Sequence, residues 1–493
     1  MPSKQEIQQY LNLMARALRV ADQFPAPFHQ MAACQDCDRI IKATIAALDD
    51  AWGKGLFVFL AHLEQAIQDT ERGQGTVDYI RAAEICRWMD RRIRYLAAAG
   101  PDGFSIYKLL PYGGVQPICT DALNTNCNET GIQIHPRYAV TKFYDQEAGR
   151  FRPLGNRDAF EGLNGQLQNI CYTHWDSRCA IHHVVVPYNY AKGKEDGPLK
   201  IAFCPMSCKS TKELLKTRNT QLERSGILFN GIQVEGVKRA RELRARFVRD
   251  WKSARDHGVD IVFGPEMLGM AELEACSGKY NRLLRQLYME SLAQKKKPPA
   301  LTILPSFWRE GLNTATVVYQ DGSVLGVQPK YAPFVDVRKG RIEALAEQET
   351  RSLLMIHIPG AHRIAVMICA DFLAIQSPEA RRLICEELGA TMIIVPAYSH
   401  GEQDFINLLP SLKNYGTTVI WGNCCGATVL PRIVGACSIA GTDGIARFGP
   451  ECKCDGVCKS SQSCVFLVDL PMCFVRAKPN APQWNKPIEH IFH

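Results

Sequence analysis

Three residues that could share one chemical task each lie at the end of a predicted strand. Glu266 closes the segment 261–266, Lys330 closes the segment 327–330, and Cys369 lies in the segment 364–371. The loops after strands are where α/β sheets place their chemistry. A thiolate can attack a carbonyl carbon, a carboxylate can shuttle the proton to a leaving amine and then from water, and an ammonium can stabilise the oxyanion. The three side chains therefore predict cysteine-based acyl transfer.

The pattern after about residue 199 predicts the framework that positions these residues. Short apolar runs alternate with longer amphipathic segments, which favours an α/β domain with a largely buried sheet. The predicted long helices are about 230–257, 279–296 and 378–389. The predicted strands are 199–203, 260–263, 301–304, 316–319, 364–368, 392–395, 418–421 and 465–468.

The first part of the chain has a different pattern. Apolar residues recur at helical spacing in four segments before residue 100, the first of them behind Ser3 as N-cap. After residue 100 the signal weakens into loop residues, with a few short strands. The expected divisions are a helical domain over 1–99, an irregular, partly β linker over 100–198, the α/β domain over 199–475 and a C-terminal tail over 476–493.

Composition narrows the class of protein. The chain has 493 residues, 20 of them cysteine, and a formal net charge of +8. That mild charge, without a motif, leaves a nucleic-acid partner unsupported. No apolar run reaches the ~18 residues that span a bilayer, and the first 20 residues lack the uninterrupted core of a secretory signal. We therefore expect a cytoplasmic protein with reduced thiols and no membrane partner.

The three segments and their flanks resemble the nitrilase, or carbon–nitrogen hydrolase, superfamily. The resemblance covers about residues 199–472, a little over half of the chain, and its patterns occur in the family's order. The flanking patterns are Leu199–Phe203, Asn313–Gly322, Leu388–Pro396, Thr418–Asn423 and Ile439–Gly444. The resemblance implies an α-β-β-α sandwich that assembles into homo-oligomers.

The resemblance also implies a role for each matching residue. Glu266 would be the general base and acid, Lys330 the cation that stabilises the oxyanion, and Cys369 the nucleophile. The backbone N–H of Ala370 would complete the oxyanion hole, and Tyr398 would lie at the substrate. Between a lysine and a carboxylate, the thiol is expected to be reactive as low-pKa cysteines are. No cofactor is required for this chemistry.

Many family members carry a second glutamate between the lysine and the cysteine. Here Glu343, Glu347 and Glu349 are candidates, and the family's usual spacing favours Glu343 as a fourth catalytic residue. The segment 340–349 also has helical spacing and could be a solvated helix. The chain departs from the family at Ala370, where an aromatic residue is usual, and this departure argues for an unusual substrate.

Four cysteines in a short insertion raise a separate hypothesis. Cys452, Cys454, Cys458 and Cys464 lie close enough in sequence to hold a structural zinc ion. Their spacing does not match a standard paired knuckle, so core packing remains the alternative. A phosphate loop is absent from the sequence, and ATP use therefore has no support.

Two functions of different classes follow from these observations. The first is a hydrolase that cleaves the C–N bond of a small linear amide, carbamoyl compound or nitrile through a thioester. The second is a catalytically weak or inactive module that oligomerises or senses a ligand in a larger system, such as a bacterial defence complex. The residues before 199 motivate the second hypothesis, because an amidase does not need them and they could bind a protein partner.

Overall fold

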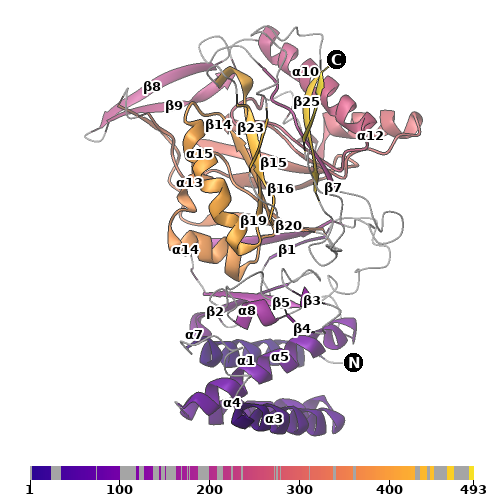
Figure 1. The fold of residues 1–493 in the computed structure, drawn as a ribbon, viewed down its shortest axis with the longest axis vertical. Coiled ribbons are helices and arrows are strands. Elements are labelled where there is room, and N and C mark those ends of the chain that lie inside the picture. Colours follow the sequence, from indigo (N-terminus) through magenta and orange to yellow (C-terminus); the bar gives the residue numbers. More distant parts are fainter. Residues whose placement is uncertain are drawn as a thin grey trace.

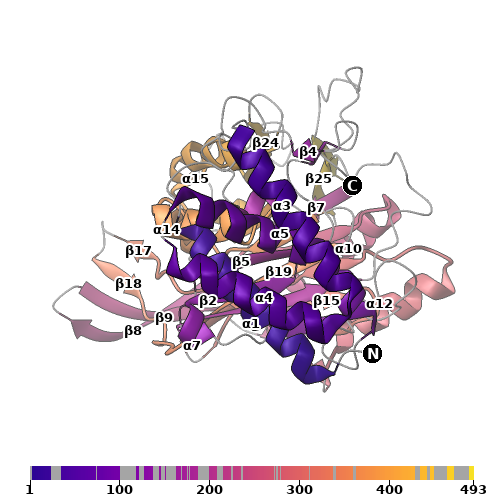
Figure 2. The ribbon, with the colours of Figure 1, turned by 90° about the horizontal axis from the view of Figure 1, so that it is seen from below.

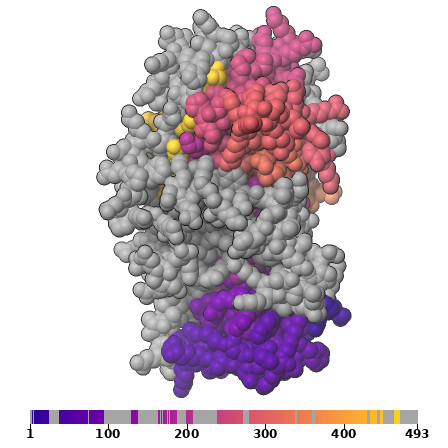
Figure 3. Space-filling view, turned by 90° about the vertical axis from the view of Figure 1, so that its right-hand side faces the viewer, coloured from indigo at the N-terminus to yellow at the C-terminus, as the bar shows by residue number. Residues whose placement is uncertain are grey.

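The computed structural model contains an N-terminal helical unit and two packed β-sheets with helices outside them (Figure 1). The N-terminal helices form one end of the molecule in the space-filling view (Figure 3). The residues that the structure describes are 3–23, 35–73, 75–99, 118–121, 127–136, 144–145, 150–151, 163–167, 169–174, 176, 178–186, 199–207, 215–223, 226–234, 237–270, 273, 276–277, 279–309, 311–336, 340–358, 362–427, 433–440, 445–448, 463–470 and 488–492.

The four helices expected before residue 100 are present. A capping box starts the first one, because the Ser3 hydroxyl accepts from Glu6 N at 3.2 Å and the Glu6 carboxylate accepts from Ser3 N at 2.7 Å. Seen from below, these helices lie across the end of the sandwich (Figure 2). They are α1 (Lys4–Asp22), α3 (Gln35–Gly53), α4 (Leu56–Arg72) and α5 (Thr76–Ala99).

The stretch 100–198 contributes strands to both parts of the molecule. β2 (Ile132–Pro136) and β5 (Ile170–His174) pair with each other, and their apolar side chains are buried in the same cluster as the helices. β6 (Cys179–Val185) instead pairs in parallel with β19 (Arg351–Ile358), a strand of the sandwich. The predicted domain boundaries remain predictions, but the stretch before residue 199 is more than a linker.

Sheet one holds the strand that precedes Cys369. Its central strands β20, β21 and β22 are parallel and buried along their whole length, as strands covered on both faces must be. In spatial order the sheet consists of β1 (Ile118–Asp121), β6, β19, β20 (His362–Val366), β21 (Met392–Ala397), β22 (Thr418–Asn423), β23 (Gly435–Ser438) and β24 (Ala446–Phe448).

Sheet two holds the strands that precede Glu266 and Lys330. Its centre is again parallel, with β10 between β7 and β13. In spatial order it consists of β14 (Phe307–Arg309), β15 (Leu312–Tyr319), β13 (Leu301–Ile303), β10 (Ile261–Phe263), β7 (Leu199–Phe203), β25 (Cys464–Leu470) and β26 (Ile488–Phe492), with β16 (Val324–Pro329) paired to β15.

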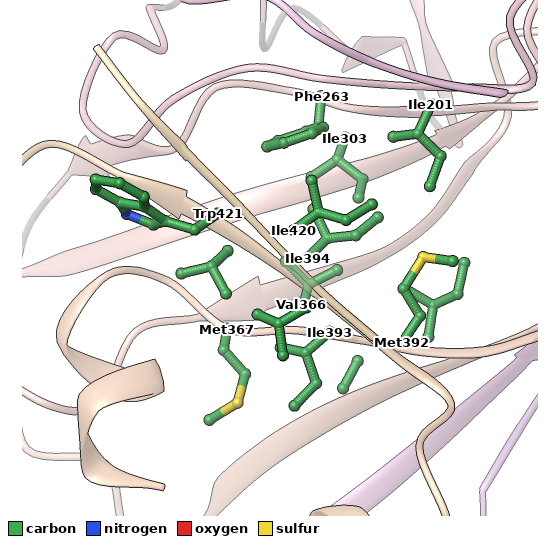
Figure 4. Close-up of a cluster of buried hydrophobic side chains, with 14 of the residues drawn as sticks. Ile201, Phe263, Ile303, Val366, Met367, Met392, Ile393, Ile394, Ile420 and Trp421 are labelled. Atoms are coloured by element: carbon green, nitrogen blue, oxygen red, sulfur yellow. The ribbon is translucent and has the colours of Figure 1, made fainter. Parts of the chain in front are cut away.

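The main core lies between the two sheets. Phe263 and Ile303 of sheet two meet Val366 and Ile420 of sheet one in one buried cluster (Figure 4). Removing a side chain of this size from water stabilises the fold by about 1.5–3 kcal/mol. The alternate strand positions, such as Val262, face a second cluster with the helices on the outer side of sheet two.

Helices cover the outer face of each sheet. In Figure 1, α10 and α12 lie on one side of the pair of sheets, and α13, α14 and α15 lie on the other. The expected α-β-β-α sandwich is therefore confirmed. These helices are α10 (Val237–Asp256), α12 (Arg282–Ala293), α13 (Ala370–Ala374), α14 (Pro378–Arg381) and α15 (Glu402–Leu408). Among the described residues, no helix is long and apolar enough to cross a membrane.

Two predicted elements differ from the structure. The helix expected from about residue 230 begins only at Val237, because β8 (Leu215–Glu223) and β9 (Gly226–Val234) form a hairpin before it. The segment 340–349, whose spacing also fitted a helix, contains the strand β18 (Arg341–Glu343). β9 pairs in parallel with β18, and this long-range pairing overrides the local helical pattern.

Three buried histidines join the helical unit to sheet one. His135 of β2 contacts His183 of β6 through ring nitrogens 3.1 Å apart, and His183 contacts His357 of β19 at 2.8 Å. His135 also bonds Thr173 of β5 at 2.9 Å. Burial lowers the pKa of His135 to about 3, and burial followed by the neighbouring rings lowers the pKa of His183 well below its usual value. His135 and His183 are therefore neutral at physiological pH.

Acid should weaken this junction. The folded-state pKa values of His135 and His183 are lowered, so their contribution to stability is present above pH 6.5, the unfolded value, and is lost as pH falls toward the folded values. That loss is about 1.4 kcal/mol per pH unit for each histidine that is kept neutral. We expect the melting temperature to fall between pH 7 and pH 5, and to fall less steeply in His183→Gln. His62→Gln, which alters an exposed histidine of α4, is the control; equal slopes in the wild type and His183→Gln would contradict the prediction.

Candidate active site

Glu266 lies in a tight loop directly after β10. The loop is held by Ser306, whose hydroxyl accepts from Met267 N at 2.9 Å and whose N–H donates to the Pro265 carbonyl at 3.1 Å. Gly264 is required at the start of the loop, because a Cβ there would lie 2.5 Å from Cγ of Pro305. The Glu266 side chain is 1% exposed, and it reaches Lys330 and the Cys369 thiol inside the molecule.

Lys330 follows β16 and lies between two carboxylates. Its Nζ donates to Glu266 Oε1 at 2.7 Å and to Glu343 Oε2 at 2.6 Å, and its side chain is 0% exposed. Burial alone would lower the pKa of Lys330, but Glu266 and Glu343 together raise it. The lysine is therefore a permanent cation in a buried cluster whose two carboxylates carry the opposite charge.

Of the three candidate second glutamates, the structure brings only Glu343 to the cluster. Glu343 ends β18, is buried, and also accepts from Phe334 N at 2.9 Å. Glu347 and Glu349 are exposed. The position of Glu343 depends on the hairpin, because β9 pairs with β18 at Glu343↔Phe229.

Cys369 sits at the turn between β20 and α13. Its backbone has φ 48° and ψ −105°, a rare conformation for a residue other than glycine, and its N–H donates to the Pro396 carbonyl at 2.9 Å. The thiol hydrogen-bonds the Glu266 carboxylate. Burial first, and the Glu266 charge second, raise the pKa of the Cys369 thiol, against the opposing effect of Lys330. The expected low pKa is therefore wrong, because the depth at which the thiol is buried depends on the whole fold and outweighs the neighbouring lysine.

Tyr398 and Ala370 flank the thiol. The backbone N–H of Tyr398 donates to Glu266 Oε2 at 3.1 Å, and it also hydrogen-bonds the Cys369 sulfur. Tyr398 therefore meets the cluster through its main chain. Ala370 is the first residue of α13 and is half-buried. Their predicted roles in binding substrate and the oxyanion remain predictions.

Two further side chains contact the cluster, and no role for them was predicted. Asn313 Nδ2 donates to Glu266 Oε1 at 2.9 Å and approaches Glu343 Oε1 at 3.4 Å. Asp371 Oδ1 accepts from the backbone N–H groups of Ala332 at 2.6 Å and Tyr331 at 2.9 Å, which fixes the loop after Lys330. Burial raises the pKa of Asp371 to about 7, although these two hydrogen bonds oppose it. Both residues lie inside segments that resemble the family, and that was the only signal for them.

The predicted zinc site falls mostly outside the described residues. Cys452, Cys454 and Cys458 are not among them, whereas Cys464 is described and is buried at the start of β25. In the part of the chain that the structure describes, no group of three or more His, Cys, Asp or Glu side chains is placed to hold a metal ion. Zinc at the insertion remains a prediction.

Comparison with known proteins gives matches among solved structures. No protein-family model matches the chain, and no curated protein matches it. An amidase of the nitrilase superfamily from Nesterenkonia AN1 is similar, with 15% identity and a TM-score of 0.36 over 56% of this chain and 92% of that one. A second structure of the Nesterenkonia sp. AN1 amidase, with acrylamide added at its active-site cysteine, has 15% identity and a TM-score of 0.35 over 57% of this chain and 96% of that one. A glutamine-dependent NAD+ synthetase from Acinetobacter baumannii has 16% identity and a TM-score of 0.31 over 55% of this chain and 45% of that one. The superfamily named from the sequence is thus the one to which the matching amidase belongs.

Proposed function

We propose that the protein is a cysteine-dependent hydrolase of the carbon–nitrogen hydrolase superfamily, acting on the C–N bond of a small linear amide, carbamoyl compound or nitrile. One observation carries the proposal. A thiol, two carboxylates and an ammonium converge in one buried cluster, with Lys330 Nζ 2.7 Å from Glu266 and 2.6 Å from Glu343 and the Cys369 thiol bonded to Glu266. Burying charged groups costs free energy, and buried clusters of titratable side chains with shifted pKa values concentrate at functional sites.

The geometry supports a two-step reaction on an amide. Because the thiol is held protonated, Glu266 takes its proton as Cys369 Sγ attacks the carbonyl carbon. Lys330 and the Ala370 N–H stabilise the oxyanion. Glu266 then returns the proton to the leaving amine, the C–N bond breaks, and a thioester remains. Water attacks the thioester carbonyl while Glu266 takes a proton from the water. The C–S bond then breaks, Glu266 returns the proton to the sulfur of Cys369, and the carboxylic acid leaves.

Selective alkylation tests the proposal. We expect iodoacetamide to modify Cys369 faster than the other buried thiols, because the Cys369 thiol hydrogen-bonds a carboxylate base, Glu266. The measurement is the mass-spectrometric rate at each cysteine in the wild type and in Cys369→Ala, together with turnover on a panel of amides and nitriles. Cys437→Ala, which removes a fully buried thiol of β23, is the matched control and should retain turnover.

The opposite outcome has a clear meaning. If Cys369 reacts no faster than Cys437 and no compound of the panel turns over, the hydrolase proposal fails. The alternative of an inactive oligomerising or sensing module would then be favoured, with the helical unit as its attachment point.

A further inference from the structure

Asn313 occupies a special position in the cluster. It lies on β15, its side chain is fully buried, and its Nδ2 group faces Glu266 at 2.9 Å and Glu343 at 3.4 Å. Its backbone carbonyl accepts from Lys330 N at 2.8 Å. One residue therefore contacts the base, the second glutamate and the cation, through side chain and main chain together.

The amide group of Asn313 can work in only one orientation. An asparagine amide offers two N–H donors at one end and an acceptor oxygen at the other. With Nδ2 between two carboxylates, each of them receives an N–H; the flipped amide would place an oxygen against two negative oxygens. With Nδ2 facing the carboxylates, Asn313 Oδ1 is buried and has no hydrogen-bond partner among the described residues. A buried acceptor without a partner is uncommon and calls for an explanation.

The two glutamates explain why that cost is tolerated. Among the residues that the structure describes, Lys330 is the cation that contacts the cluster, and its Nζ pairs with both carboxylates at once. Oε1 of Glu266 accepts from Lys330 and Asn313, and Oε2 accepts from Tyr398 N. The same carboxylate hydrogen-bonds the Cys369 thiol. For Glu343 Oε1, Asn313 is the donor that the described residues provide.

We infer that Asn313 is a positioning residue for the proposed reaction: its amide fixes Glu266 with one oxygen toward Cys369 and stabilises the ionised carboxylate that takes the thiol proton. The inference rests on the proposed function. Without the Nδ2 donor, the charged form of Glu266 loses a hydrogen bond and remains buried beside Glu343, which favours its protonated form. The base would then work only at higher pH.

Two variants test this role by different means. Asn313→Asp keeps the shape of the side chain but replaces the Nδ2 donor by an oxygen of a third carboxylate. Asn313→Ala removes the amide group. The matched control is Asn281→Ala, another fully buried asparagine, whose Nδ2 donates to the Leu273 carbonyl at 2.6 Å outside the cluster. For each protein, the rate of Cys369 alkylation by iodoacetamide is measured from pH 5 to pH 9, with the fraction folded from circular dichroism and turnover where a substrate is known.

We expect both Asn313 variants to shift the pH midpoint of Cys369 alkylation upward by about one unit, so that the rate at pH 6 falls by about tenfold, as one pKa unit requires. Asn281→Ala should change the folded fraction without moving the midpoint. The inference is overturned if the midpoints of both Asn313 variants stay at the wild-type value and their rates follow the folded fraction, as in the control. If wild-type Cys369 is itself no more reactive than other thiols, the proposed function fails and this inference falls with it.

Discussion

Glu266→Gln should lower turnover by on the order of 10²–10⁴, the range that a general acid–base contributes. Glutamine keeps the shape of the side chain and can still bond Lys330, but it cannot accept the thiol proton. Because burial raises the pKa of Cys369, the thiol does not ionise unaided at neutral pH. The measurements are kcat on any substrate from the panel and the rate of Cys369 alkylation, and both should fall together.

The control for this variant is a second buried carboxylate. Glu84 of α5 is 3% exposed and pairs with Arg87 and Arg91, so Glu84→Gln removes a buried charge without touching the cluster and should keep turnover. The wild-type pH profile provides an independent check. Burial raises the pKa of Glu266, so activity should be lost as pH falls through a value above the ordinary 4.5. Turnover of Glu266→Gln within tenfold of the wild type would contradict the assignment.

Lys330→Met should be the most destabilising single change in the cluster. It leaves Glu266 and Glu343 buried without their cation, and an uncompensated buried charge costs about 3–5 kcal/mol. The loss of the cation proposed to stabilise the oxyanion should also lower kcat by about 10²–10³. Thermal unfolding and turnover measured on the same preparation separate the two effects.

The stability loss in Lys330→Met should depend on pH with a definite sign. Burial already raises the pKa of Glu266, and the lysine opposes that shift. Without the lysine, the neutral form of this carboxyl group is therefore favoured further in the fold. Stability is then retained at low pH and lost as pH rises through the folded value. The gap in melting temperature between wild type and variant should be smaller at pH 5 than at pH 8. Lys54→Met, which breaks an exposed ion pair with Asp50, should have almost the same melting temperature as the wild type. If the difference in melting temperature between Lys330→Met and the wild type did not change with pH, the result would be inconsistent with two unpaired carboxylates.

The parts of the site that the sequence predicted are those with a local signature. Glu266, Lys330 and Cys369 each lie at the end of a predicted strand, and these strands lie in the two packed sheets. The family's spacing favoured Glu343, but the sequence did not predict its strand, because β18 is held by pairing with a distant hairpin. Asn313 lies in a segment that resembles the family, but its contacts with Glu266 and Glu343 depend on residues that are distant in sequence.

Contacts between residues distant in sequence also explain which parts of the fold were not predicted. β6 contains two histidines that interrupt its apolar pattern, so the sequence between 100 and 198 suggested irregular structure. In the fold, His183 is satisfied by His135 and His357, which lie on strands far away in sequence. The raised pKa of Cys369 had a similar origin, because burial outweighs the neighbouring lysine and burial depends on the whole sandwich.

The pairing of β6 with β19 bears on how the two parts of this protein can have evolved. β6 lies inside sheet one, between β1 and β19. A descendant that lost β1 and β6 would therefore expose the edge of β19, a strand of eight residues. Bare edges recruit other strands and lead to aggregation. The stretch that contains β1 and β6 therefore belongs to the sandwich, and we expect the two to be inherited together.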